Sequence, residues 1–410
     1  MTISLYAFSL LICCIVCSLV SGGAPTTDCT ALKNSLLSPF VEGNFVCLSN
    51  EAFPVGVKDN SSVNNIPSKL LKRDFHKEIR LILQHLRANR RKRPDEGAVF
   101  RPNKGAVFFG PSGTGKSWAA MAVLVDELAL AEKTGRTVVY FDSVSKCAYV
   151  FGKHRYVRIK DVSRGPNSTD IPELELEETL LIYDAMAGSK DELLIFRCEY
   201  LIFSSPNAGN YKQAARSGLL RFICPNWTVE ELKELEHGYG DRFPSGEVES
   251  RFEQYGGSPR LVVSLDVNSS AVQLKDAKLM LQGKLSLWSD STALGSDWPC
   301  SLLKAKYDTD KTATTPEQAF EKYSESNVEW EFASTTAYEL VSREYEALSD
   351  NDKKVFEAWL MDEPKAASLH GHFFENKVER LMSIQPEEVE IKTLEDNTNK
   401  DQLTLLFFTH

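Results

Sequence analysis

The chain has 410 residues, of which 42% are hydrophobic and 25% are charged, and its formal net charge at pH 7 is -10. These proportions are typical of a globular protein with room for two or three domains. The negative balance excludes a protein that coats nucleic acid through bulk charge, although it leaves room for a local basic site.

The first residues differ from the rest of the chain. Residues 3–20 are almost wholly apolar, and small residues and Pro25 follow them. This pattern predicts a secretory signal peptide over residues 1–24, which would leave no stable membrane span once it is removed. Because the apolar run is near the length that crosses a bilayer, a membrane anchor is the alternative.

Six cysteines follow this leader, scattered without the spacing of a metal site. A chain of this length can build a hydrophobic core, so we do not expect a disulfide framework. Four Asn-x-Ser/Thr sequons begin at Asn60, Asn167, Asn226 and Asn268. They matter only if the chain passes through the secretory lumen.

Residues 25–70 are polar and irregular, with short β-prone pieces at residues 45–48 and 53–57. Residues 70–86 predict an amphipathic helix, and a basic run (residues 87–93) follows it. Such a run is typical of nuclear-import signals and of phosphate-binding patches, and a solvated linker is the alternative. We expect its charges to be exposed, because an unpaired buried charge is costly.

A glycine loop (residues 110–117) fits the phosphate-loop pattern GxxxxGK[ST] at every fixed position. An apolar, β-prone run precedes it, and a stretch rich in Ala and Leu, without Gly or Pro, follows it as a predicted helix. Backbone N–H groups of such a loop converge on phosphate, and the helix N-terminus adds positive potential. We therefore expect a nucleotide site formed by Gly110, Pro111, Ser112, Gly113, Thr114, Gly115, Lys116 and Ser117. Lys116 would reach the β- and γ-phosphates, and the Ser117 hydroxyl would take a Mg²⁺ position.

Residues 104–265 predict one α/β unit in which strands alternate with helices. Alternation of this kind implies a mostly parallel sheet with helices on both faces. The predicted strands are residues 106–109, 137–142, 179–184, 200–204 and 219–224.

Asp184 ends one of these strands, where a nucleotide enzyme places the aspartate that holds Mg²⁺. The alternative is an aspartate that merely begins a turn. Ala185 follows it, where many ATPases place a glutamate that orients the attacking water. Hydrolysis is therefore expected to be slow, or nucleotide binding itself to be the signal.

Two further residues are candidates for contact with the nucleotide. Asn207 belongs to the polar tip that follows the strand at residues 200–204, and it would approach the γ-phosphate unless the tip is a simple turn. Arg260 follows a Gly-Gly-Ser-Pro sequence that opens a helix, and it would act as a sensor arginine or else lie on the surface. Thr228 is expected to cap a helix that continues to Leu235.

Residues 266–350 are predicted to be helical and polar. In residues 351–410, helices are expected at residues 353–360 and 371–381, with a strand near residues 389–394.

The order and spacing of several motifs resemble the NTPase type of Crinkler effectors, which are related to retrotransposon hot spot proteins. The motifs are GPSGTGKS, TLLIYD, LIFSSPN, PNWTVEELKEL and RFEQYGGSPR, and the resemblance covers about residues 100–395. It implies secretion, entry into a host cell and action in the host nucleus, with a host nuclear protein or DNA as partner. It also implies a ubiquitin-like header, of which residues 45–71 resemble a degenerate piece.

Related proteins couple the NTPase to a restriction-endonuclease-like nuclease, which needs an Asp strand followed by a [DE]xK pair. Glu390 and Lys392 spell such a pair, but no suitable Asp strand precedes them. We therefore expect an inert nuclease remnant.

The fold expected from the sequence is α/β: a P-loop NTPase with a mostly parallel sheet, then a mainly helical region and a truncated α/β remnant. The predicted segments are a signal peptide (1–24), a degenerate header (25–70), a basic helix and linker (71–103), the NTPase core (104–265), a helical region (266–350) and the remnant (351–410). The expected ligands are ATP and Mg²⁺, with Lys116 and Asp184 as the catalytic residues. The alternatives are an NTPase without turnover that docks host protein or DNA, and an intracellular regulatory ATPase.

Overall fold

The computed structural model describes fourteen parts of the chain: residues 40–42, 45–47, 69–91, 105–111, 113–143, 147–152, 158–161, 165–185, 196–205, 219–239, 246–262, 302–307, 312–362 and 366–384. Several predictions fall outside these residues and stay predictions. They concern the signal peptide (1–24), residues 53–57, Ser112, Asn207 and the pair of Glu390 and Lys392.

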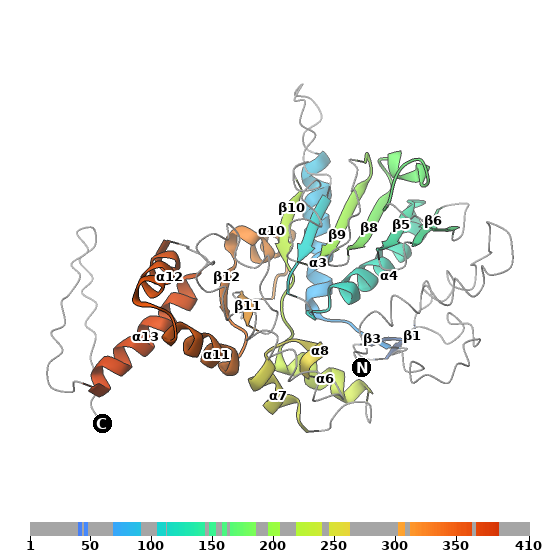
Figure 1. Ribbon diagram of the computed structural model, residues 1–410. Helices are drawn as coiled ribbons and strands as arrows, with labels where there is room; N and C mark the ends of the chain where they lie inside the picture. The colour runs from blue at the N-terminus through green and yellow to red at the C-terminus, as the bar shows by residue number, and fades with distance from the viewer. Residues whose placement is uncertain are drawn as a thin grey trace.

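A seven-stranded sheet organises the described part of the chain (Figure 1). Its order is β10–β4–β9–β8–β5–β6–β7; the first five strands run parallel to their neighbours, and β6 and β7 continue the sheet in antiparallel pairing. The strands are β4 (Gly105–Phe109), β5 (Val138–Asp142), β6 (Cys147–Phe151), β7 (Arg158–Asp161), β8 (Leu180–Ala185), β9 (Glu199–Ser204) and β10 (Leu220–Ile223). The mostly parallel sheet predicted from the sequence is confirmed, whereas β6 and β7 were missed.

The parallel strands are not ordered in space as they are in the chain. β4 and β5 follow one another in sequence, but β9 and β8 lie between them. The connection from β4 to β5 therefore crosses two strands, and α4 (Lys116–Thr134) spans that distance on one face of the sheet. The carboxyl ends of β4, β9 and β8 consequently lie side by side, which is where parallel sheets bind ligands.

Side chains of these strands alternate between two hydrophobic clusters, as the period of a strand requires. In β8, Leu180 and Ile182 pack with α4, whereas Leu181 and Tyr183 belong to the cluster of the opposite face. β4, β8 and β9 are buried along their whole length. Burial on both faces explains why they are continuous apolar runs in the sequence.

The segment before the sheet differs from its prediction. A helix was expected over residues 70–86, but Lys69–Leu71 forms β3 and the helix α3 spans Asp74–Arg91. β3 pairs with β2 (Phe45–Cys47), which pairs with β1 (Phe40–Glu42), in a small antiparallel sheet. The expected β-prone piece at residues 45–48 is thus confirmed. The basic run begins inside α3 rather than in a linker.

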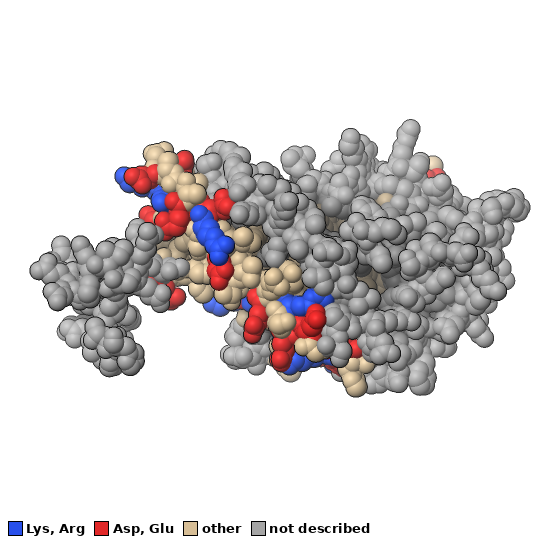
Figure 2. Space-filling model, turned by 60° about the horizontal axis from the view of Figure 1, so that its bottom comes forward, with Lys and Arg blue, Asp and Glu red and all other residues tan. Residues whose placement is uncertain are grey.

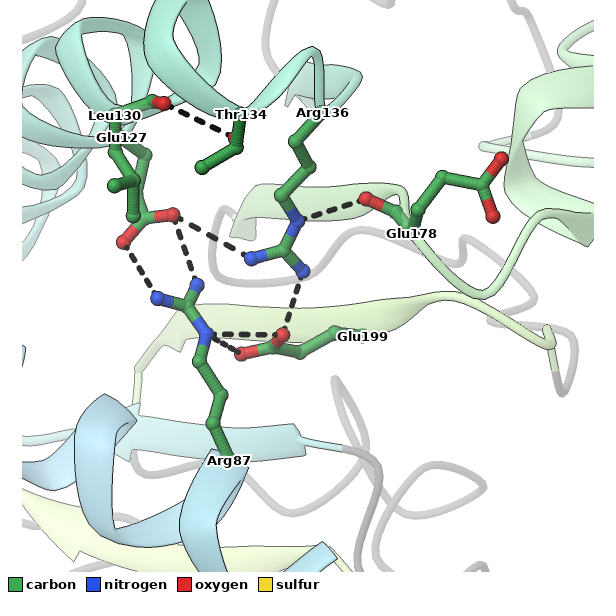
Figure 3. Close-up of polar contacts among 7 residues, drawn as sticks. All are labelled: Arg87, Glu127, Leu130, Thr134, Arg136, Glu178 and Glu199. Carbon is green, nitrogen blue, oxygen red and sulfur yellow. Dashed lines mark hydrogen bonds and ion pairs between the residues drawn. The ribbon is translucent and has the colours of Figure 1, made fainter. Parts of the chain in front are cut away.

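Arg87 corrects the expectation that the charges of the basic run are exposed. Figure 3 shows its guanidinium between the carboxylates of Glu127 in α4 and Glu199 in β9, beside Arg136 from the turn after α4. Arg136 also binds both carboxylates and donates to the carbonyl oxygen of Glu178. Glu127 and Glu199 are 5% and 6% exposed, so these ion pairs are shielded from water and satisfy buried charge.

A second buried carboxylate joins α3 to α10 (Pro316–Tyr323). Glu78 is 3% exposed and accepts hydrogen bonds from the Tyr323 hydroxyl, from Lys322 Nζ at 3.0 Å and from the backbone N–H of Ala313 at 2.8 Å. These contacts attach a segment from the second half of the chain to the helix that precedes the sheet.

Three short helices follow β10 and lie below the sheet in Figure 1: α6 (Val229–Tyr239), α7 (Val248–Tyr255) and α8 (Pro259–Val262). Thr228 caps α6 as predicted: its Oγ1 accepts from the Glu231 N–H, and the Glu231 carboxylate accepts from the Thr228 N–H. Apolar residues of these helices form a separate core that includes Leu232, Val248 and Leu261.

The C-terminal part is largely helical, as expected, but it also contains a two-stranded antiparallel sheet that the sequence did not predict. That sheet pairs β11 (Leu303–Lys306) with β12 (Glu329–Phe332). The helical elements around it are η6 (Glu325–Asn327), α11 (Thr335–Glu346), α12 (Asp350–Asp362) and α13 (Ala367–Ile384), and another short element, η2 (Pro172–Glu175), precedes β8. None of the described helices is both long and apolar enough to cross a membrane.

The face that carries α6, α7 and the C-terminal helices presents mixed charge (Figure 2). Acidic side chains lie beside basic ones there. Ion pairs of the helices concerned include Lys233 of α6 with Glu249 of α7, and Arg343 with Glu339 within α11. The described part of this face therefore lacks the single-sign basic stripe that binds nucleic acid.

Candidate functional site

The glycine loop lies at the carboxyl end of β4 and leads into α4. Gly113 and Gly115 have φ angles of 85° and 84°, in the left-handed region that glycine adopts without strain. A Cβ on Gly115 would also approach Trp227 Nε1 to 3.0 Å, which is a tight contact, so both the φ angle and the available space favour glycine here. The conformation agrees with the glycines of the predicted phosphate loop.

Lys116 turns back across the loop. Its Nζ donates to the carbonyl oxygens of Gly110 at 2.8 Å and Pro111 at 2.7 Å, and the Thr114 hydroxyl donates to the same Pro111 oxygen at 3.0 Å. These bonds hold the Lys116 ammonium group over the loop. An anion that binds there would compete with two neutral carbonyls for the ammonium group, and a charged acceptor makes the stronger hydrogen bond.

The start of α4 lacks a side-chain cap from its own N-cap residue. Gly115 occupies that position and has no side chain that could accept a hydrogen bond, and the first turn holds no acidic residue. By contrast, Thr315 and Ser334 cap α10 and α11 with their hydroxyl groups. Uncapped N–H groups at a helix start, with the helix dipole behind them, form a site for phosphate.

Asp184 and Ser117 come from neighbouring elements on one face of the sheet. Asp184 is the fifth residue of β8, so by strand alternation it shares the side of Ile182, which packs with α4. Its side chain is nearly buried, and its carbonyl oxygen accepts from the Ser143 N–H at 3.2 Å. Ser117 lies in the first turn of α4 and is half-buried. A hydroxyl and a carboxylate are oxygen donors that suit Mg²⁺.

The described residues hold no group of three His, Cys, Asp or Glu side chains that would form an all-protein metal centre. Mg²⁺ keeps several waters and is usually bound by one or two carboxylates together with phosphate oxygens. Ser117 and Asp184 are therefore candidates for binding a metal together with phosphate oxygens.

Ser204 ends β9 between the two strands that carry the loop and Asp184. It pairs in register with Phe109 of β4 and with Ala185 of β8. Its side chain is fully buried, and its hydroxyl makes no hydrogen bond to the rest of the described structure. Asn207, predicted to approach the γ-phosphate, follows three residues later and lies outside the described residues.

Arg260 is only partly placed. Its backbone belongs to α8, which begins at Pro259 as the sequence predicted, but its side chain is not described. Its predicted role at the nucleotide stays a prediction.

Trp227 also contacts the loop, although no sequence pattern predicted this contact. The indole Nε1 donates to the Thr114 carbonyl oxygen at 3.0 Å, and Trp227 is 2% exposed. A buried tryptophan usually has an acceptor for its indole N–H, so a partner for Trp227 was to be expected. Trp227 and Thr114 are 113 residues apart in the chain, so no local pattern could identify Thr114 as that partner.

Arg73 stacks on the Trp227 indole, with its guanidinium carbon 4.6 Å from a ring centroid. It also pairs with Glu231 at 2.9 Å and donates to the carbonyl oxygens of Asn226 at 2.8 Å and Pro225 at 3.3 Å. The segment before α3 and the segment before α6 are thus joined beside the loop.

Cys224 lies under the loop but is not suited to covalent chemistry. Its backbone N–H donates to the Phe109 carbonyl oxygen at 2.7 Å, and its thiol is buried. Burial raises the pKa of this thiol to about 12, although the positive charges of Lys116 and Arg73 oppose the shift. A protonated thiol is a poor nucleophile, so Cys224 packs rather than reacts.

No family model and no curated protein matches this chain. Among solved structures, a chain from work on the structural basis of katanin self-assembly is 14% identical, with a TM-score of 0.30 over 79% of this chain and 99% of that chain. AMPPCP-bound DnaA from Aquifex aeolicus is 10% identical, with a TM-score of 0.26 over 76% of this chain and 91% of that chain. Likenesses this weak carry no argument.

The fold defines the class of protein. The chain is a mixed α/β protein with a mostly parallel sheet, a glycine loop at the carboxyl edge of that sheet, and a largely helical C-terminal region.

Proposed function

We propose that this protein binds a nucleoside triphosphate, with ATP as the expected ligand, together with Mg²⁺ at the glycine loop. The observation that carries the proposal is the combination of two left-handed glycines, a glycine at the N-cap of α4 and the Lys116 ammonium group over one loop. Each of the three favours a bound anion, and a triphosphate is the anion that would use all of them.

Each residue has a distinct part in this proposal. The N–H groups of residues 113–117 would orient the phosphates, and Lys116 would leave the carbonyl oxygens of Gly110 and Pro111 to bind the β- and γ-phosphates. The Ser117 hydroxyl and the Asp184 carboxylate would hold Mg²⁺, which neutralises phosphate charge when it is bound. Ser204 offers a hydroxyl at the same edge of the sheet.

Binding to the loop is tested with the full-length chain by titration calorimetry with ATP and Mg²⁺. Lys116→Ala should weaken binding by roughly 10- to 100-fold, because a hydrogen bond to a charged group contributes roughly 1.5–3 kcal/mol. Lys133→Ala, in the exposed last turn of the same helix, is the matched control and should bind like the wild type. Equal affinity in wild type and Lys116→Ala would refute the assignment of the loop.

Turnover separates an ATPase from a nucleotide-dependent binding module. Ala185, which follows Asp184 in β8, has no side chain that can orient water, and this favours slow hydrolysis or none. Phosphate release by the wild type that Lys116→Ala abolishes would establish an ATPase. Tight ATP binding without release would favour a module that docks a host protein or DNA.

We further propose that the chain is a secreted effector of the Crinkler type that acts in a host cell. The support is the order of motifs in the sequence, three of which meet in space. The loop contacts Trp227 of the PNW motif, and the Trp227 N–H donates to the Gly257 carbonyl oxygen of the GGSPR motif at 2.9 Å. The N-terminal residue of the protein purified from the cells that produce it and from their medium, determined by mass spectrometry, tests this origin. Cleavage near residues 21–24 is expected, and an intact leader on protein retained in the cells would favour the intracellular regulatory ATPase.

A further inference from the structure

Trp227 is fixed on several sides by parts of the chain that are distant in sequence. Its backbone N–H donates to the Gly257 carbonyl oxygen, and a Cβ on Gly257 would come within 2.0 Å of the Trp227 oxygen. Trp118 in α4 packs against its indole in a T-shaped arrangement, with ring centroids 5.9 Å apart, and the Arg73 guanidinium lies over the ring. An indole held in this way has little freedom to turn.

The indole touches the glycine loop at one peptide unit. Its Nε1 donates to the Thr114 carbonyl oxygen at 3.0 Å, and Gly115 leaves the space in which that ring lies. The peptide unit that carries the Thr114 oxygen also carries the Gly115 N–H. The peptide between Thr114 and Gly115 is trans, as are the others in the part of the chain that the structure describes, so these two groups point in opposite directions from the same plane.

Fixing the oxygen therefore fixes the N–H. We propose that Trp227 is a positioning residue: its hydrogen bond to Thr114 holds the 114–115 peptide so that the Gly115 N–H points toward the phosphate side of the loop. The inference rests on the proposed nucleotide site, because it assigns that N–H a phosphate oxygen as acceptor. It also makes the α6–α8 helices, whose core contains Trp227, a support for the loop.

Pre-orientation has a physical consequence for affinity. Glycine residues can adopt both positive and negative φ angles, so they give the loop many alternative conformations, and a ligand must select one of them. A peptide that is already held does not have to be ordered on binding, so part of the entropic cost is removed in advance. Loss of the indole N–H would return that freedom without removing any group that touches the ligand.

Trp227→Phe removes the donor and keeps an aromatic ring. In the full-length chain it should weaken ATP binding with Mg²⁺ by roughly three- to tenfold, in line with the loss of one buried hydrogen bond. Trp330→Phe is the matched control, because Trp330 is also 2% exposed but lies in β12, away from the loop. The control should bind within twofold of the wild type, and circular dichroism verifies that both variants are folded.

A second readout requires no nucleotide. Hydrogen–deuterium exchange at the Gly115 and Lys116 amides should be faster in Trp227→Phe than in Trp330→Phe, since only the former releases the 114–115 peptide. If Trp227→Phe does not fold, benzothienylalanine at position 227, which keeps both rings and replaces the N–H by sulfur, takes its place.

The outcomes separate the two proposals. A wild type that does not bind ATP overturns the proposed function, and the exchange measurement then decides this inference alone. A wild type that binds, with Trp227→Phe of equal affinity, overturns this inference and leaves the proposed function standing. Equal exchange in the Trp227 and Trp330 variants overturns it in either case.

Discussion

The Nε of Arg87 lies 3.1 Å from a carboxylate oxygen of Glu199, and this contact joins the last turns of α3 to the first residue of β9. Arg87 thus belongs to the buried network at the amino-terminal edge of the sheet, whereas the glycine loop lies at the carboxyl edge. Within the basic run, Arg87 therefore has a structural role in the fold. The proposed roles in nuclear import or phosphate binding concern the residues of the run that follow it.

Arg87→Met should lower the free energy of unfolding by about 1–2 kcal/mol. The change leaves Glu127 and Glu199 with Arg136 as a remaining partner, so the cost is below that of an uncompensated buried charge. Urea denaturation at pH 7 measures it. Arg343→Met, from an exposed pair with Glu339 on α11, should change stability by under about 0.5 kcal/mol. An equal effect of the two variants would contradict a structural role for Arg87.

Ser117→Ala should weaken ATP binding more in the presence of Mg²⁺ than in its absence, because the hydroxyl is proposed to bind the metal rather than the phosphate. Asp184→Asn should behave in the same way. Calorimetry in Mg²⁺ and in EDTA gives the two affinities for each variant. Ser250→Ala, on the exposed side of α7, serves as the control. An equal loss in both buffers would show that Ser117 does not act through the metal.

His76 should make the protein less stable as the pH falls below about 6.5. Burial lowers the pKa of His76 well below its ordinary value, and the positive charges of Arg73 and Lys72 add to the shift. The unfolded chain then takes up a proton at this residue that the folded chain does not, so the free energy of unfolding decreases with falling pH, by up to about 1.4 kcal/mol per pH unit.

Urea denaturation between pH 7 and pH 5 measures this dependence. His76→Gln should show a shallower fall than the wild type, whereas His237→Gln, which changes an exposed residue of α6, should keep the wild-type slope. Identical slopes in the wild type and His76→Gln would contradict a neutral, buried imidazole.

Cys224 should resist alkylation in the folded protein. With a pKa raised to about 12 by burial, the thiolate fraction at pH 8 is about one in ten thousand, and the sulfur is also shielded. Iodoacetamide followed by peptide mass spectrometry should find Cys224 unmodified in native protein and modified after denaturation in urea. Equal labelling in both states would mean that the strand end beneath the loop opens readily.

Replacing Arg90, Arg91, Lys92 and Arg93 with Ala should move leaderless protein from the nucleus to the cytoplasm of an expressing plant or animal cell. These substitutions spare Arg87, so the network at the start of β9 is kept. Fluorescence microscopy measures the distribution, and salt-dependent DNA binding measures the alternative in which the run grips phosphates. If neither property changes, the alternative of a solvated linker is favoured.

Local pattern was sufficient for the parallel strands and for the glycine loop. β4, β8 and β9 are buried on both faces, so each is a continuous apolar run that stands out against its polar surroundings. The conformation of Gly113 and Gly115 follows from the motif itself, because only glycine adopts such φ angles readily. The capping of α6 by Thr228 was equally visible, since a capping box spans four consecutive residues.

Pairing between distant segments was beyond the reach of local pattern. β6 and β7 extend the edge of the sheet, and β11 pairs with β12 across more than twenty residues of sequence. Such strands were not predicted because the stability of a strand depends on its pairing partner, which its own sequence does not specify. α3 was expected to begin at residue 70, but Lys69–Leu71 forms a strand because it pairs with β2.

The difference between local pattern and contacts of distant segments also applies to the proposed site. The sequence by itself determined which residues are candidates for phosphate and metal binding, since Lys116, Ser117 and Asp184 carry suitable chemical groups wherever they lie. Only the tertiary structure decided that Trp227 holds the Thr114 carbonyl and that Arg87 is enclosed by Glu127 and Glu199. Contacts of this kind join residues brought together by the packing of whole elements, and that packing is set by the sum of many weak interactions rather than by any short motif.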